Sequence, residues 1–202
     1  MITLTGSDLT IKDVVSCARE FEKVKLSVEA NEKMMESQKL VIKLLHSHKT
    51  VYGVNTGFGN LSTEKIDEDD VESLQVNLLR SHSCGVGEPL SSDVVRAMML
   101  LRANSLAKGF SGIRPCVVQL LLDMLNNRIH PLVPSKGSIG ASGDLAPLAH
   151  IGLCLIGEGT VVFENVEMSS KMAFEKVGIH PVTLQAKEGL ALINGTQLMS
   201  AL

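Results

Sequence analysis

Residues 137–150 read GSIGASGDLAPLAH, a glycine-rich loop that runs directly into an apolar helical pattern. That pattern predicts a helix over about residues 145–156. The loop before it contains three small residues in a row, Ala141, Ser142 and Gly143. Small side chains let a backbone bend tightly, and glycine lacks the Cβ that would block a close approach. This loop is therefore the first candidate for a functional site.

Two common catalytic loops do not fit this segment. A nucleophile elbow needs Gly-x-Ser-x-Gly, but Asp144 occupies the position of the last glycine. A phosphate-binding loop needs a lysine after its glycines, whereas Lys136 precedes them. A plain turn, with Asp144 as the N-cap of the following helix, fits the spacing well.

A less common chemistry also fits the same residues. The backbone nitrogen of Gly143 could attack the carbonyl carbon of Ala141, and loss of water would close a five-membered ring. Loss of a second water from Ser142 would leave an exocyclic methylidene, which is a carbon electrophile. Asp144 stands beside the ring, where its carboxylate could assist proton transfer. Spacing alone leaves the plain turn and the ring both open.

Composition narrows the class of protein. The chain has 202 residues, of which 45% are hydrophobic and 20% charged, so it has the composition of a folded chain. Its formal net charge of −3 and its 3% aromatic content argue against a nucleic-acid binder. The uncharged apolar stretch at residues 145–157 is too short to cross a membrane. No signal peptide is recognisable at the start, and we expect a cytoplasmic protein.

Cofactor motifs are missing from the sequence. The four cysteines show no Cys-x-x-Cys spacing, which predicts free, buried thiols in a reducing compartment rather than a metal site or disulfides. Neither Gly57-Phe-Gly59 nor Gly85-Val-Gly87 carries the third glycine of a dinucleotide fingerprint. The sequence therefore predicts no metal and no nucleotide.

Local signals predict a mostly α chain with short β-hairpins. Thr10 followed by Asp13 marks a helix start, Pro115 fits the first turn of a helix, and Asn165 lies at a hairpin turn. A long apolar helix is expected to begin near Lys187 and to run to Leu202. Because that pattern is still running at the last residue, the sequence looks truncated.

The glycine-rich stretch resembles the signature of the histidine and phenylalanine ammonia-lyase family. Four further blocks resemble the same family in the same order: YGVNTGFG at 52–59, SHSCGVG at 81–87, FSGIRP at 110–115 and KEGLALINGTQ at 187–197. In that family Ala-Ser-Gly cyclises autocatalytically to a methylidene-imidazolone prosthetic group. The resemblance implies that Ala141, Ser142 and Gly143 form this group, with Asp144 in support.

The pair Ser81-His82 separates branches of the family. Histidine-specific members resemble this sequence here, whereas phenylalanine-specific members carry an apolar pair and tyrosine-specific members differ in the preceding residue. The resemblance therefore implies elimination of ammonia from L-histidine to give urocanate, the first step of histidine degradation, with phenylalanine or tyrosine as the sibling alternative. His82 can exchange a hydrogen bond with an imidazole, which a phenyl ring cannot do.

The resemblance also implies roles for individual residues. Tyr52, the only tyrosine in the chain, would take the β-proton of the substrate. Asn194 would hydrogen-bond the prosthetic group or the bound amino acid, and His82 would orient the substrate imidazole. Ser142 supplies the carbon of the electrophile. The expected catalytic residues are thus Tyr52, His82, Ser142 and Asn194.

The family's architecture sets the remaining expectations. Residues 1–109 would form an α-rich N-terminal region, and residues 110–202 would begin a central bundle of long helices that is cut off in a helix. Family members are more than twice this long and form homotetramers whose active sites combine several subunits. We therefore expect the isolated 202-residue chain to be inactive. The alternative is an inactive remnant or interaction subunit.

Overall fold

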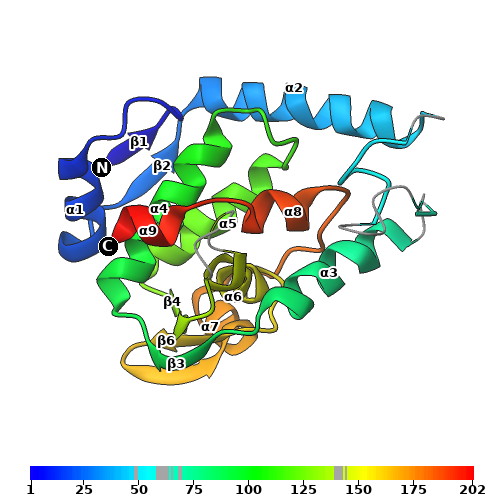
Figure 1. The fold of residues 1–202 in the computed structure, drawn as a ribbon. Helices are drawn as coiled ribbons and strands as arrows, with labels where there is room; N and C mark the ends of the chain where they lie inside the picture. Colours follow the sequence, from blue (N-terminus) through cyan, green and yellow to red (C-terminus); the bar gives the residue numbers. More distant parts are fainter. Residues whose placement is uncertain (48–49, 58–63, 65, 68–69, 139–142, 144) are drawn as a thin grey trace.

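The computed structural model describes residues 1–47, 50–57, 64, 66–67, 70–138, 143 and 145–202. Helices dominate these residues, so the expectation of a mostly α chain is confirmed (Figure 1). The helices are α1 (Ile11–Glu20), α2 (Val28–Leu45), α3 (Val71–His82), α4 (Ser92–Ala107), α5 (Pro115–Asn126), α6 (Leu145–Leu155), α7 (Ser170–Val177), α8 (Glu188–Ile193) and α9 (Gln197–Ala201). The strands are β1 (Ile2–Leu4), β2 (Val24–Leu26), β3 (Val86–Pro89), β4 (His130–Pro131), β5 (Pro134–Lys136), β6 (Thr160–Phe163) and β7 (Val166–Ser169).

Local signals set several helix ends as predicted. Thr10 and Asp13 form a capping box at the start of α1, in which each side chain accepts the backbone N–H of the other residue. Pro115 occupies the first turn of α5, where its missing N–H costs no intrahelical bond. Gly178 ends α7 with a φ of +73°, a conformation that glycine adopts without steric cost.

The short strands form three small sheets. β6 and β7 make the predicted hairpin, and Glu164 and Asn165 form its turn with positive φ angles of 52° and 63°. β4 adds to β6, and β3 pairs antiparallel with the distant β5. β1 and β2, which the sequence did not predict, pair in parallel on either side of α1 in the chain.

The core forms around α4, which is buried on nearly all sides. Six consecutive residues, Val95 to Leu100, are buried, because α1, α5 and α9 all pack against this helix. One apolar cluster includes Met98, Leu121, Leu148 and Leu192. Residues on both sides of Gly109 thus share a core, and a domain boundary at Gly109 stays a prediction. Among the described residues, no helix is long and apolar enough to cross a membrane.

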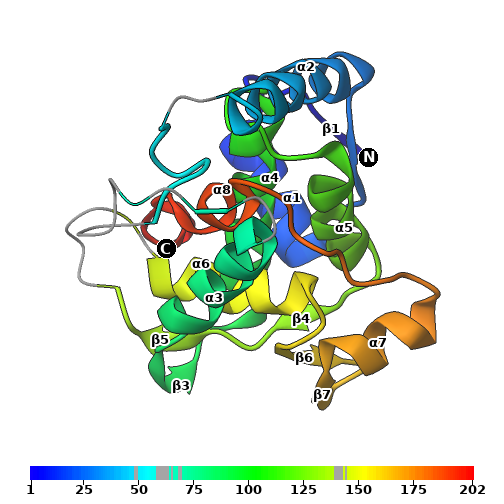
Figure 2. The ribbon, with the colours of Figure 1, turned by 90° about the vertical axis from the view of Figure 1, so that its right-hand side faces the viewer.

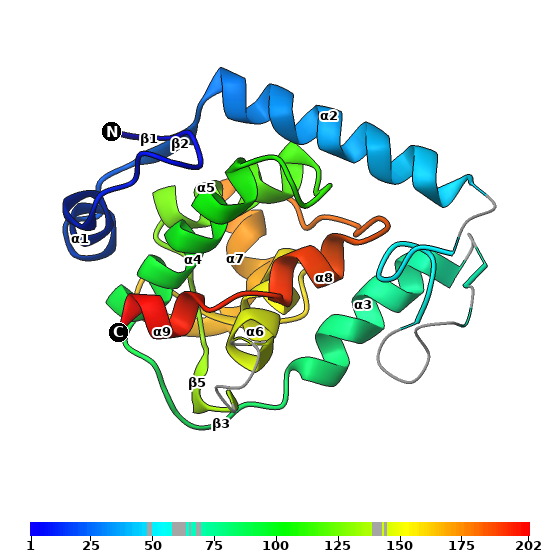
Figure 3. The same ribbon diagram turned by 45° about the horizontal axis from the view of Figure 1, so that its top comes forward.

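The predicted single helix from Lys187 to Leu202 is wrong. Helix α8 ends at Ile193, and α9 begins only at Gln197. Figure 3 shows the two helices joined by a short extended link, with α9 beside α4. The apolar pattern continues across the link, but Arg102 of α4 donates hydrogen bonds to the carbonyl oxygens of Ala191 and Asn194. In a continuous helix these carbonyl oxygens would accept backbone N–H groups of the next turn. Here they accept the guanidinium of Arg102 instead.

The four cysteines are free, as predicted, but only half of them are buried. Cys17 and Cys154 lie in the interior, whereas Cys84 and Cys116 are exposed. Their predicted burial is therefore wrong for Cys84 and Cys116. Cys84 follows the end of α3, and Cys116 is in the first turn of α5.

Candidate active site

The last residue of the Ala-Ser-Gly sequence lies against the link between α8 and α9. Gly143 has a φ of +114°, and a methyl group built on its Cα would lie 2.7 Å from the carbonyl oxygen of Gly195. That distance is too short for any real Cβ, so both the conformation and the close approach require glycine. Ala141, Ser142 and Asp144 lie outside the described residues.

Asn194 stands at the end of α8, one residue before this contact. Its backbone N–H donates to the carbonyl oxygen of Leu190 at 3.1 Å, and its ψ of 94° turns the chain out of the helix. Its side chain is exposed. The predicted Asn194 therefore lies next in sequence to Gly195, whose carbonyl group packs against Gly143.

His82 is the last residue of α3. Its Nδ1 lies 2.9 Å from the carbonyl oxygen of Leu78 and 3.1 Å from Oγ of Ser81. A carbonyl oxygen can only accept, so Nδ1 carries the proton and Nε2 of the neutral ring is an acceptor. The end of the helix therefore determines which ring nitrogen can accept a hydrogen bond from a ligand.

The segment after His82 packs against the start of the glycine-rich loop and against α6. The backbone N–H of Gly85 donates to Nε2 of His150 on α6 at 3.1 Å. A methyl group on Gly137 would lie 3.1 Å from the Cα of Gly85, and β3 pairs with β5 just before the loop. Figure 2 shows these strands side by side. Burial lowers the pKa of His150, which favours the neutral imidazole that can accept this bond.

Tyr52 lies on a turn whose inner residues are buried. The side chain of Tyr52 is 56% exposed, whereas Asn55 and Thr56 are almost fully buried. Asn55 accepts the backbone N–H of Val51 at 2.7 Å, and Val54 packs in a small cluster with residues of α2 and α3. The turn therefore presents Tyr52 outward. His82 lies at the end of α3, and Asn194 follows α8. The three predicted residues are therefore held in place by three different parts of the chain.

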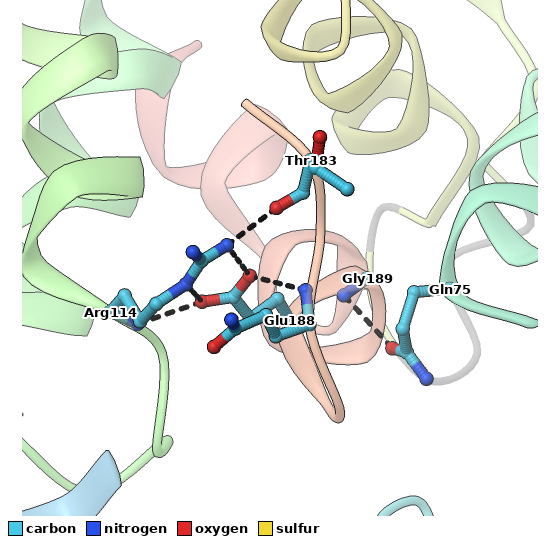
Figure 4. Close-up of polar contacts among 6 residues, drawn as sticks. Gln75, Arg114, Thr183, Glu188 and Gly189 are labelled. Atoms are coloured by element: carbon cyan, nitrogen blue, oxygen red, sulfur yellow. Dashed lines mark hydrogen bonds and ion pairs between the residues drawn. The ribbon is translucent and has the colours of Figure 1, made fainter. Parts of the chain in front are cut away.

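A buried ion pair anchors the start of α8 (Figure 4). The carboxylate of Glu188, 1% exposed, accepts Nε and Nη2 of Arg114 at 2.8 and 2.7 Å. It also accepts the backbone N–H groups of Arg114 and Gln185. The guanidinium and the carboxylate form a two-point contact, and Glu188 raises the pKa of Arg114.

Gln75 ties α3 to the same helix. Its side-chain oxygen accepts the backbone N–H groups of Gly189 and Leu190 at 2.9 and 3.3 Å. These are N–H groups of the first turn of α8, which have no partner inside the helix. The helix that ends at His82 and the helix that ends just before Asn194 are therefore joined by a buried polar contact.

The sequence did not predict several of the residues that hold α3, α4 and α8 together. Arg114 and Glu188 each lie in a recognised motif, but nothing in either motif shows that they pair across the chain. Arg102 and Gln75 lie outside every motif that carries the family resemblance. In the part of the chain that the structure describes, no group of three His, Cys, Asp or Glu side chains could hold a metal ion.

Comparison with known proteins gives a consistent assignment. The sequence profile of the aromatic amino acid lyases matches residues 9–202. A curated histidine ammonia-lyase from Geobacillus thermodenitrificans is 54% identical over 202 residues, which cover all of this chain and 40% of that protein. The chain thus spans about 40% of the length of the curated relatives that it matches.

Solved structures show the same arrangement. Ergothionase from Treponema denticola superposes with a TM-score of 0.96 at 38% identity, covering 99% of this chain and 40% of that one. Histidine ammonia-lyase from Trypanosoma cruzi superposes with a TM-score of 0.91 at 39% identity, covering 99% of this chain and 38% of that one. Both similarities therefore extend over almost the entire chain.

Proposed function

Because the chain belongs to the aromatic amino acid lyase family, we propose that it serves the elimination of ammonia from L-histidine to give urocanate. Curated relatives at 50–54% identity are named histidine ammonia-lyase, which supports this substrate over phenylalanine and tyrosine. One observation carries the proposal: Gly143, the last residue of the Ala-Ser-Gly sequence, packs against Gly195, the residue that follows Asn194. A homotetramer and a cytoplasmic location belong to the same proposal.

The residues present fit the prosthetic group of the family. Gly143 has no Cβ, and its φ of +114° belongs to a backbone that glycine adopts far more readily than other residues. We expect its nitrogen to close a ring on the carbonyl carbon of Ala141, with loss of one water there and a second from Ser142. Asp144 would assist the proton transfers. The resulting methylidene-imidazolone supplies an electrophile, which ordinary side chains lack.

The other residues bind the substrate and move its proton. Nε2 of His82, an acceptor, would take a hydrogen bond from the imidazole N–H of the substrate. The amide of Asn194 would hold the amino-acid portion of the substrate, and the phenolate of Tyr52 would remove the β-proton. The outward position of Tyr52 on a well-anchored turn suits a base that must meet a substrate.

Intact mass is the direct test of this proposal. The natural polypeptide that contains these residues, purified from its source, should weigh less than its sequence by two water molecules, and a peptide map should place the loss at residues 141–143. The same preparation should release urocanate from histidine faster than it deaminates phenylalanine or tyrosine. A protein that retains both waters would contradict the proposal. A preference for phenylalanine or tyrosine would favour the sibling function.

Replacing Tyr52 with Phe should lower kcat by roughly 100-fold, because general-base catalysis contributes at least that much. The ring should still form, since Tyr52 is exposed and lies on a different segment from Gly143. Urocanate formation measured by absorbance, together with intact mass, separates the two effects. Unchanged kcat in a fully dehydrated variant would remove Tyr52 from the mechanism.

Replacing His82 with Leu should change substrate preference. The lost hydrogen bond should lower kcat/KM for histidine by roughly tenfold, whereas kcat/KM for phenylalanine should fall less or rise. His180→Leu is the matched control, because His180 is an exposed histidine in the segment between α7 and α8. Equal losses for histidine and phenylalanine would show that His82 does not read the substrate ring.

A further inference from the structure

The guanidinium of Arg102 lies at the break between α8 and α9. Arg102 belongs to α4 and is only 5% exposed. Its Nη1 donates to the backbone oxygen of Asn194 at 2.9 Å and to the side-chain oxygen of Gln197 at 3.2 Å, and its Nη2 donates to the carbonyl oxygen of Ala191. One side chain thus holds the end of α8, where partial negative charge gathers, and the start of α9.

Ordinary ion pairing does not explain this arginine. Among the described residues, no carboxylate forms an ion pair with Arg102. Burial lowers its pKa to about 10, so it is still protonated at neutral pH. A buried charge without a charged partner costs free energy that an apolar side chain of similar volume would avoid. The position therefore needs the hydrogen bonds that the guanidinium makes to the break.

Gly195 lies between those hydrogen bonds and Gly143. A methyl group on Gly195 would lie 2.5 Å from Nη1 of Arg102 and 2.1 Å from the side-chain oxygen of Gln197. The carbonyl oxygen of the same Gly195 is the atom that excludes a Cβ from Gly143. A shift of the backbone at Gly195 would therefore move both the group that packs against Gly143 and the neighbouring Asn194.

We infer that Arg102 is a positioning residue for ring closure and for Asn194. The inference rests on the function proposed above, but it concerns a residue outside the recognised motifs. Arg102 donates to the carbonyl oxygen of Asn194, and the carbonyl group of the next residue, Gly195, packs against Gly143. Arg102 therefore acts on the reacting atoms only through this stretch of backbone. Misplacement of this backbone by about 1 Å is enough to slow a reaction that depends on alignment.

The test compares two buried arginines of the same helix. Arg102→Met removes the hydrogen bonds to the break, and Arg102→Lys leaves one cationic donor. The matched control is Arg96→Met, since Arg96 is 1% exposed and donates to the carbonyl oxygens of Cys17, Ala18 and Leu125, away from the break. The readouts are the fraction of chains that have lost two waters, kcat and KM for histidine, and Tm.

Arg102→Met should lower the dehydrated fraction or kcat by roughly tenfold, with Arg102→Lys between it and the unmodified protein. Arg96→Met should lower Tm and leave dehydration complete. Full dehydration with unchanged kcat in Arg102→Met would overturn the inference; if that variant does not fold, the same result in Arg102→Lys decides. If the unmodified protein keeps both waters, the proposed function fails instead.

Discussion

A Gly143→Ala variant should keep both of the waters that ring closure would release, and it should show no lyase activity above background. The new methyl group would lie 2.7 Å from the carbonyl oxygen of Gly195, and the residue would have to hold a φ of +114°. Alanine cannot meet both conditions, so the loop must move away from the link between α8 and α9. The nitrogen that has to attack the carbonyl of Ala141 then leaves its place.

The matched control for this variant is Gly178→Ala. Gly178 also has a left-handed φ, +73°, but a methyl group there would meet nothing within 4 Å. That control should lose about 1 kcal/mol of stability through backbone strain and retain full dehydration. Intact mass and urocanate formation are measured on both variants. A fully dehydrated, active Gly143→Ala protein would show that the glycine contact is unnecessary for ring formation.

Glu188→Gln should lower the free energy of unfolding by about 3–5 kcal/mol, because it breaks a buried ion pair. The carboxylate of Glu188 is buried and accepts four N–H groups, two of them from the guanidinium of Arg114. A glutamine has nearly the same shape, but only one of its two terminal atoms can accept. The change therefore leaves donors unsatisfied and an arginine without its counter-charge.

The control for this loss is Glu158→Gln. Glu158 also accepts two N–H groups from an arginine, Arg80, but both side chains are substantially exposed. Water can replace the lost contacts there, so the expected loss is far smaller. Denaturant unfolding of the two variants gives the comparison directly. Equal losses would mean that burial of the Arg114–Glu188 pair contributes little.

The fold was most predictable where the determining residues are neighbours in sequence. Thr10 and Asp13 are three residues apart, and the hairpin turn at Glu164 and Asn165 is decided within two residues. The break after Ile193 was missed because it depends on Arg102, which lies 92 residues from Asn194. The strands β1 and β2 are three residues each, too short to show an alternating pattern.

The candidate site was predictable as a set of residues rather than as a geometry. Motifs pointed to Tyr52, His82 and Asn194, but no spacing shows that Gly195 packs against Gly143. The same holds for Arg114 and Glu188, which lie 74 residues apart. Contacts of this kind are created by packing of whole helices, and a single sequence records only that the residues are small or charged.

The contact between Gly143 and Gly195 also orders events during synthesis of the chain. A ribosome releases the Ala-Ser-Gly sequence before it releases α8 and α9, because translation runs from the N-terminus. While translation continues, the sequence is an ordinary tripeptide without the wall that Gly195 provides. On the proposed function, the electrophile would be created only after its surroundings have assembled. Cellular thiols and amines would then meet it inside a finished fold rather than on an exposed nascent chain.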